Sequence, residues 1–137
     1  AIVKNRLYAA NVFKVFLNMK FAKNKDFQIN IHTFSSPSDA IENRSIFYDL
    51  VITGYLFTKD IFIIDGISLA RMMKNLNKDT FIVLHTTFLK GIDDYMKILE
   101  ENKDVVDYYF DPDLEKNEIF DKNIENIIYE IVSKKNN

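Results

Sequence analysis

The segment YDLVITG, residues 48–54, decides the fold of this chain. Leu50, Val51 and Ile52 form a continuous apolar run of β-prone residues, and Gly54 supplies a turn signal directly after it. Such a run predicts a central strand of a parallel sheet, buried on both of its faces. Open α/β folds place their sites at the carboxyl ends of such strands, so residues around Gly54 are the first functional candidates.

The rest of the chain alternates between predicted strands and predicted helices. Besides the run at 50–52, strands are expected at 1–3, 27–31, 80–85 and 105–110. The strand at 27–31 is expected at an edge, because its apolar and polar residues alternate strictly. Helices are expected at 8–23, 37–43, from 65 through about 73, 88–102 and from Pro112 onward, the second capped by Ser36 and the last by Asp111 and Asp113. This alternation predicts a doubly wound α/β fold, a five-stranded parallel sheet covered by about five helices in a three-layer sandwich.

Length and composition describe one ordinary globular domain. The 137 residues are 47% hydrophobic and 28% charged, which fits a single domain over 1–137, alone or as part of a longer regulator. A net charge of -2 argues against direct nucleic-acid binding. With no cysteine and two histidines, no metal site and no cofactor is expected. Neither a signal peptide nor an apolar run of about 18 residues is present, so the expected location is cytoplasmic and not at a membrane.

The combination "YDLVITG…DGISLARMMK" resembles the core of the receiver domains of two-component response regulators. The resemblance spans nearly the whole chain and is strongest at 48–73 and 108–112. It implies the flavodoxin-like strand order 2-1-3-4-5. It also implies a role in signal transduction, in a phosphorelay or in transcriptional regulation.

The resemblance places the receiver site on residues that have lost its chemistry. The acidic pair that binds Mg²⁺ falls on Lys4 and Asn5, and the acceptor aspartate falls on Gly54. The switch hydroxyl falls on His85, or on Thr86 after a one-residue shift. The lysine that receivers carry after the fifth strand falls on Asp111. Phosphoryl transfer needs a nucleophilic carboxylate and a cation, so these substitutions predict a degenerate receiver that is not an enzyme and has no catalytic residue.

Alternative interpretations remain open at several of these residues. Lys4 and Asp111 form either an ion pair that locks the site or two solvated loop residues. His85 is either a pH-sensitive switch or a structural histidine. Asp107, Asp111 and Asp113 could be imagined as a cation site, although capping accounts for two of them. An active receiver whose acceptor is Asp49 or Asp60 is a weaker reading.

Two apolar surfaces are predicted to contact other proteins. The first is the loop with Phe57, Ile61, Phe62 and Ile63, which either folds over the empty pocket or exposes an apolar patch. The second is the face with Phe88, Tyr95, Tyr108 and Tyr109, where receivers form dimers. The predicted function is therefore phosphorylation-independent interaction with a protein partner or a second copy. The alternative is a small-ligand sensor that uses the vacated pocket at the carboxyl ends of the strands.

Overall fold

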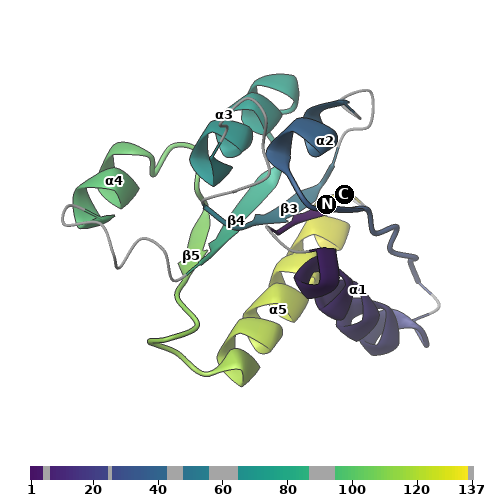
Figure 1. Ribbon diagram of the computed structural model, residues 1–137. Helices are drawn as coiled ribbons and strands as arrows, with labels where there is room; N and C mark the ends of the chain where they lie inside the picture. Colours follow the sequence, from purple (N-terminus) through teal and green to yellow (C-terminus); the bar gives the residue numbers. More distant parts are fainter. Residues whose placement is uncertain (5–6, 25, 43–47, 56–64, 87–94, 136–137) are drawn as a thin grey trace.

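The computed structural model describes residues 1–4, 7–24, 26–42, 48–55, 65–86 and 95–135. Its centre is a parallel five-stranded sheet of order β2-β1-β3-β4-β5 (Figure 1). The strands are β1 (Ile2–Val3), β2 (Thr33–Phe34), β3 (Leu50–Thr53), β4 (Phe81–His85) and β5 (Tyr108–Phe110). The predicted fold class and strand order are confirmed.

Helices cover both faces of this sheet, as the predicted three-layer sandwich requires. α1 (Leu7–Phe21) and α5 (Asn117–Lys135) lie on one face, and α2 (Pro37–Glu42) and α3 (Gly66–Leu76) lie on the other, with α4 (Tyr95–Glu101) beside β5 (Figure 1). Two clusters of buried side chains match these layers, one between the sheet and α2–α4 and one between the sheet and α1 and α5. The start expected for α4, at residue 88, lies outside the described residues. Among the described helices, none is long and apolar enough to span a membrane.

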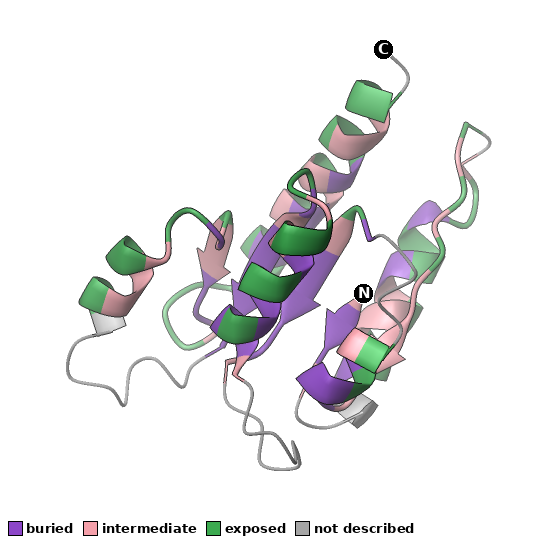
Figure 2. Cartoon of the chain, turned by 90° about the horizontal axis from the view of Figure 1, so that it is seen from above, coloured by how far each residue is buried: buried purple, intermediate pink, exposed green. Residues whose placement is uncertain are grey.

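The two apolar runs form the middle of the sheet, as expected. Val51, Ile52, Ile82 and Val83 are at most 1% exposed, and Figure 2 shows the central strands as the most continuously buried part of the chain. Ile52 belongs to the cluster under α1 and α5, and Val51 to the cluster on the other face. Successive strand residues point to opposite faces, so this parity also decides which site residues can meet.

The prediction of an edge strand at 27–31 is wrong. The second strand is β2, whose register pairs Ile2 with Thr33, and residues 27–32 have no strand assignment. The apolar alternation is real, because Phe27, Ile29 and Ile31 pack against the cluster under α1 and α5. The alternation of apolar and polar residues therefore indicated which side chains are half-buried, but it could not indicate which residues pair with the neighbouring strand.

The start predicted for the last helix is also wrong. Residues 112–114 form a turn, in which Asp111 Oδ1 accepts a hydrogen bond of 2.9 Å from Asp113 N, and α5 begins only at Asn117. Helix stability in proteins comes mainly from packing an apolar face. Leu114 is 63% exposed, and the first buried residue of the helix is Phe120. The turn before the helix therefore lacks a buried apolar side chain that would stabilise it as a further helical turn.

Candidate functional site

Residues from four strands meet at the carboxyl edge of the sheet. The register pairs Val3 with Thr53, Thr53 with Leu84, and His85 with Phe110. The residues at or after these strand ends, Lys4, Gly54, His85, Thr86 and Asp111, therefore lie along one edge, as the sequence predicts. Asn5 lies outside the described residues.

Lys4 and His85 make the central contact of this edge. Lys4 Nζ lies 3.1 Å from His85 Nδ1 and donates a 2.8 Å hydrogen bond to the His85 carbonyl oxygen. An ammonium group can only donate, so Nδ1 is the acceptor and the ring carries its proton on Nε2. One lysine side chain thus joins the end of β1 to the end of β4, across β3.

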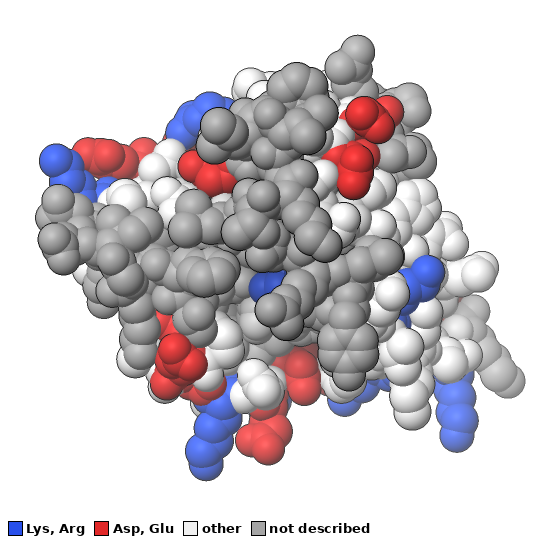
Figure 3. All heavy atoms as spheres, in the orientation of Figure 1, with Lys and Arg blue, Asp and Glu red and all other residues white. Residues whose placement is uncertain are grey.

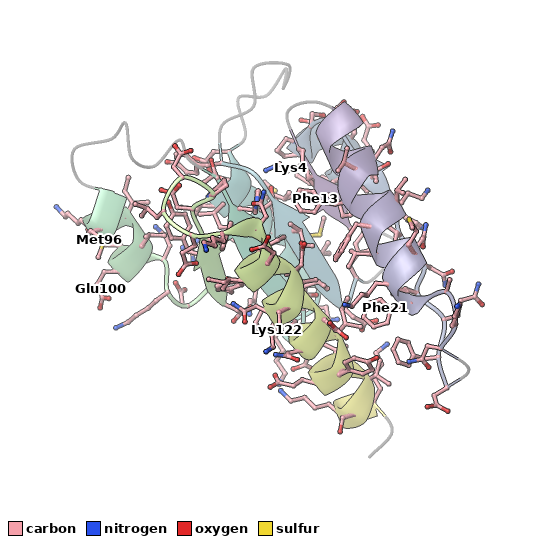
Figure 4. The ribbon with its side chains drawn as sticks, turned by 90° about the horizontal axis from the view of Figure 1, so that it is seen from below. Lys4, Phe13, Phe21, Met96, Glu100 and Lys122 are labelled. Carbon is pink, nitrogen blue, oxygen red and sulfur yellow. The ribbon has the colours of Figure 1, made fainter. Side chains whose placement is uncertain are left out.

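Three phenylalanines surround the imidazole of His85. The ring stacks on Phe110 at a centroid distance of 5.4 Å and an interplanar angle of 12°. Phe120 of α5 lies 4.6 Å away, and Phe13 of α1 meets the ring edge-on at 5.1 Å. Figure 4 shows Lys4 and Phe13 close together at this end of the molecule. The histidine is therefore part of the packing between the sheet, α1 and α5.

Burial shifts the pKa of both partners toward the neutral form. The pKa of His85 is lowered to about 3, chiefly because burial disfavours the imidazolium and secondly because the Lys4 ammonium repels it. Burial also lowers the pKa of Lys4 to about 8. Near pH 7 the pair consists of a charged lysine and a neutral histidine. This supports the structural interpretation of His85 over a switch that titrates near neutral pH.

The ion pair proposed between Lys4 and Asp111 is not formed. Among the described residues, no carboxylate lies within 4.0 Å of Lys4 Nζ. Lys4 lies two residues after Ile2, so its side chain points to the same face of the sheet as that of Ile2, toward α1 and α5. Asp111 instead follows Phe110 toward the opposite face, where its Oδ2 accepts a long hydrogen bond of 3.4 Å from the Tyr109 hydroxyl. Parity therefore separates the two side chains.

Thr86 and Tyr109 lie together on the α3 side of the edge. Thr86 is 4% exposed, its backbone N donates to the Phe110 carbonyl at 3.1 Å, and its own carbonyl accepts from the Tyr109 hydroxyl at 3.3 Å. Thr86 and Asp111 thus share one face, whereas Lys4 and His85 share the other. The edge is divided into two half-sites by the sheet itself.

The N-terminus of α3 packs directly on the end of β3. Asp65 caps the helix, its carboxylate accepting a 2.7 Å hydrogen bond from Ser68 N. Gly66 N donates to the Tyr55 carbonyl at 2.7 Å, and a Cβ added at Gly66 would overlap the Gly54 carbonyl oxygen. Only glycine allows this approach, because it has no Cβ. The Asp65-Gly66 pair therefore serves packing as well as capping.

The acidic residues after β4 do not assemble a cation site. Asp107 accepts a hydrogen bond from Ile82 N at 2.7 Å and pairs with Lys74 Nζ at 2.8 Å, so it links β4 to α3. Asp111 and Asp113 share the turn before α5. Across the described ranges, no group of three or more His, Cys, Asp or Glu side chains could hold a metal ion.

Most of the predicted interaction surface lies outside the described residues, namely Phe57, Ile61, Phe62, Ile63 and Phe88. Tyr95 is the first residue of α4. Tyr108 is half-buried on the α5 side, where its hydroxyl accepts a 3.0 Å hydrogen bond from Asn123 Nδ2. Tyr109 faces the α3 side, so the two tyrosines do not share one surface.

A cavity of about 780 Å³ lies away from the predicted site, toward the amino ends of β1 and β3. It is bounded by α1, α5 and residues 26–32. Its lining combines aliphatic side chains such as Leu17 and Ile128 with the polar side chains of Lys14, His32 and Lys135.

No protein-family model and no curated protein sequence matches the chain. Among solved structures, the one described as "BeF3 Activated DrrB Receiver Domain" matches 93% of this chain and 94% of its own, with a TM-score of 0.64 and 16% sequence identity. The chain has the fold of a receiver domain. At this identity the likeness concerns the fold alone.

Sequence reasoning missed the Lys4–His85 contact and the three phenylalanines around it. A signal was present, because Lys4 has the parity of Ile2, and His85 has the parity of Val83. Combined with the expected strand order, this parity assigns both side chains to one face. Phe13 and Phe120 could be recognised only as core residues of amphipathic helices, since their contact with His85 depends on how α1 and α5 lie across the sheet.

Proposed function

We propose that this chain is a receiver-like signalling module that takes no phosphoryl group and acts by binding proteins. In this role it is not an enzyme, and it takes part in signal transduction or transcriptional regulation through contacts that do not depend on phosphorylation. Direct nucleic-acid binding is not part of the proposal, because the net charge is -2.

The observation that carries the proposal is the Lys4–His85 contact at the carboxyl edge. Mg²⁺ needs oxygen ligands, preferably carboxylates, and the Lys4 ammonium instead puts a positive charge beside the end of β1. Gly54, at the position that the resemblance gives to the acceptor, has no side chain to phosphorylate. Both parts of the phosphoryl-transfer machinery, the cation and the nucleophile, are thereby replaced.

Incubation with acetyl phosphate and Mg²⁺, followed by intact-mass measurement, tests this proposal. A receiver domain with its aspartate intact serves as the positive control. We expect no added mass on this chain under conditions that phosphorylate the control. The added mass of one phosphoryl group would reject the proposal and redirect attention to Asp49 or Asp60 as the acceptor.

A second candidate function, small-ligand sensing, is favoured by the cavity between α1, α5 and residues 26–32. Ligand sites combine an apolar lining with a few polar groups, and this cavity has both. It lies away from the vacated edge that sequence reasoning favoured. Isothermal titration with a panel of small anionic and neutral metabolites, repeated on Leu17→Trp to fill the cavity, separates specific binding there from weak binding elsewhere.

A further inference from the structure

The outward face of α1 is apolar, although it faces away from the core. The helix buries Ala10, Leu17 and Phe21 against the sheet and α5. On its opposite side Val12, Val15 and Met19 are 51%, 57% and 75% exposed. These three residues, here called the α1 stripe, follow an i, i+3, i+7 spacing and therefore line up along one side of the helix.

An exposed helix face normally carries charged and polar side chains. The α1 stripe breaks this pattern over two helical turns, and contiguous exposed apolar residues of this kind mark contact surfaces. The side chains are not needed for the core, since the opposite face of the same helix already supplies it. The charges around the stripe indicate which kind of partner it accepts.

The charges of α1 point away from the stripe. Lys20 pairs with Glu125 of α5 at 3.1 Å, and Lys14 lines the cavity toward α5. On the flank of the stripe that holds Lys14, the polar residues nearest to it, Asn11 and Asn18, are uncharged. Lys23 is exposed but lies beyond the last residue of the helix. Among the described residues at the lower right of Figure 3, where α1 lies, most atoms are uncharged, a few are basic and none are acidic.

We propose that the α1 stripe binds the α1 stripe of a second copy of this chain. A two-fold contact brings a surface against itself, so that surface must not carry unpaired like charges, and an uncharged apolar stripe meets this condition. An acidic partner helix or an anionic membrane would instead engage cations beside the stripe, and the two lysines of α1 are directed elsewhere. The contact is one form of the protein interaction proposed above and rests on that role, but it uses α1 in place of the face around α4 and β5.

Sedimentation velocity of the purified chain tests the contact. The chain concentration is varied from about 1 µM to about 1 mM, a range that covers the dissociation constants of weak complexes. Wild type should shift from monomer to dimer across this range. Met19→Lys places a charge in the stripe and should weaken dimerisation by about tenfold or more. Met96→Lys is the matched control, since Met96 is 65% exposed on α4, on the opposite side of the molecule (Figure 4). Circular dichroism verifies that both variants are folded.

Cysteine cross-linking then locates the contact, because the chain has no cysteine of its own. Val15→Cys should form a disulfide-linked dimer under mild oxidation, and Met96→Cys should not. A wild-type chain that stays monomeric, or a dimer broken by Met96→Lys and not by Met19→Lys, overturns the inference. Neither result affects the acetyl phosphate experiment, so the loss of the α1 contact is distinguishable from a failure of the proposed function.

Discussion

At the scale of single residues, the Lys4–His85 contact shows how a charge can be accommodated without a counter-ion. The ammonium gains two acceptors, the imidazole Nδ1 and the His85 carbonyl, but no described carboxylate. Burial of an ammonium without a carboxylate disfavours its charged form, and this lowers the pKa of Lys4 to about 8. The protonation of this lysine should therefore be visible in the stability of the protein.

We expect Lys4 to make the folded state more stable as the pH rises from about 8 to about 10.5. In this window the unfolded chain, with an ordinary lysine pKa of 10.5, holds a proton that the folded chain has released. Stability rises wherever the unfolded state binds more protons, here by up to about 3 kcal/mol. Below about pH 8 both states are protonated and this gain is absent.

Urea unfolding of wild type and Lys4→Met across this range measures the effect. The difference in unfolding free energy should move in favour of wild type as the pH rises, while the tyrosines common to both proteins cancel. Lys97→Met is the control, because the Lys97 side chain is 72% exposed. Parallel pH profiles for wild type and Lys4→Met would contradict the assignment.

The second residue-scale prediction concerns the protonation of His85. Because its pKa is lowered to about 3, the ring should stay neutral down to about pH 5, with its proton on Nε2. In the unfolded chain the imidazole takes up a second proton near pH 6.5, so stability should fall as the pH drops below that value. His32→Asn leaves His85 as the single imidazole. Nitrogen NMR of this variant tests the prediction, and a titration midpoint near 6.5 would refute it.

At the scale of elements, the success of sequence reasoning depended on whether local pattern and tertiary packing agree. The apolar runs that became β3 and β4 are buried from both faces, so their composition alone indicated their place. The strand prediction at residues 27–31 was wrong, because burial on one side of a segment does not imply a hydrogen-bonded neighbouring strand. The predicted start of α5 was wrong, because Pro112 and Asp113 suit a turn as well as a helix start. The helix buries its first residue only at Phe120.

A prediction at this scale concerns the contact between α3 and β3. Gly66→Ala should destabilise the protein by about 1–3 kcal/mol, because the new Cβ would overlap the Gly54 carbonyl and push the helix from the sheet. Asn75→Ala, at an exposed position of the same helix, should change stability by no more than about 0.5 kcal/mol. Chemical denaturation of both variants measures the difference. Equal stabilities would show that the helix start can shift without cost.

At the scale of the whole molecule, strand order and side-chain parity together decide which residues share a site. The sequence placed Lys4, Gly54, His85 and Asp111 at one edge, and the structure agrees. The sheet then sends Lys4 and His85 toward α1 and α5, and Asp111 toward Tyr109 on the other face. The Lys4–Asp111 ion pair, one of the two alternatives considered for these residues, is excluded at this step, because nearness along an edge does not give contact across a sheet.

The position of Lys4 at this edge predicts that a single substitution at Gly54 cannot restore receiver chemistry. Gly54→Asp supplies a carboxylate at the expected acceptor position, but the Lys4 ammonium remains beside it and no acidic ligand for Mg²⁺ is gained on β1. Because phosphoryl transfer requires the cation as well as the nucleophile, we expect Gly54→Asp to gain no phosphoryl mass from acetyl phosphate. The double variant Lys4→Asp with Gly54→Asp, which replaces the cation by a ligand, should bind Mg²⁺ more tightly than the single variant in a calorimetric titration. Phosphorylation of Gly54→Asp alone would show that the Lys4–His85 contact does not exclude the metal.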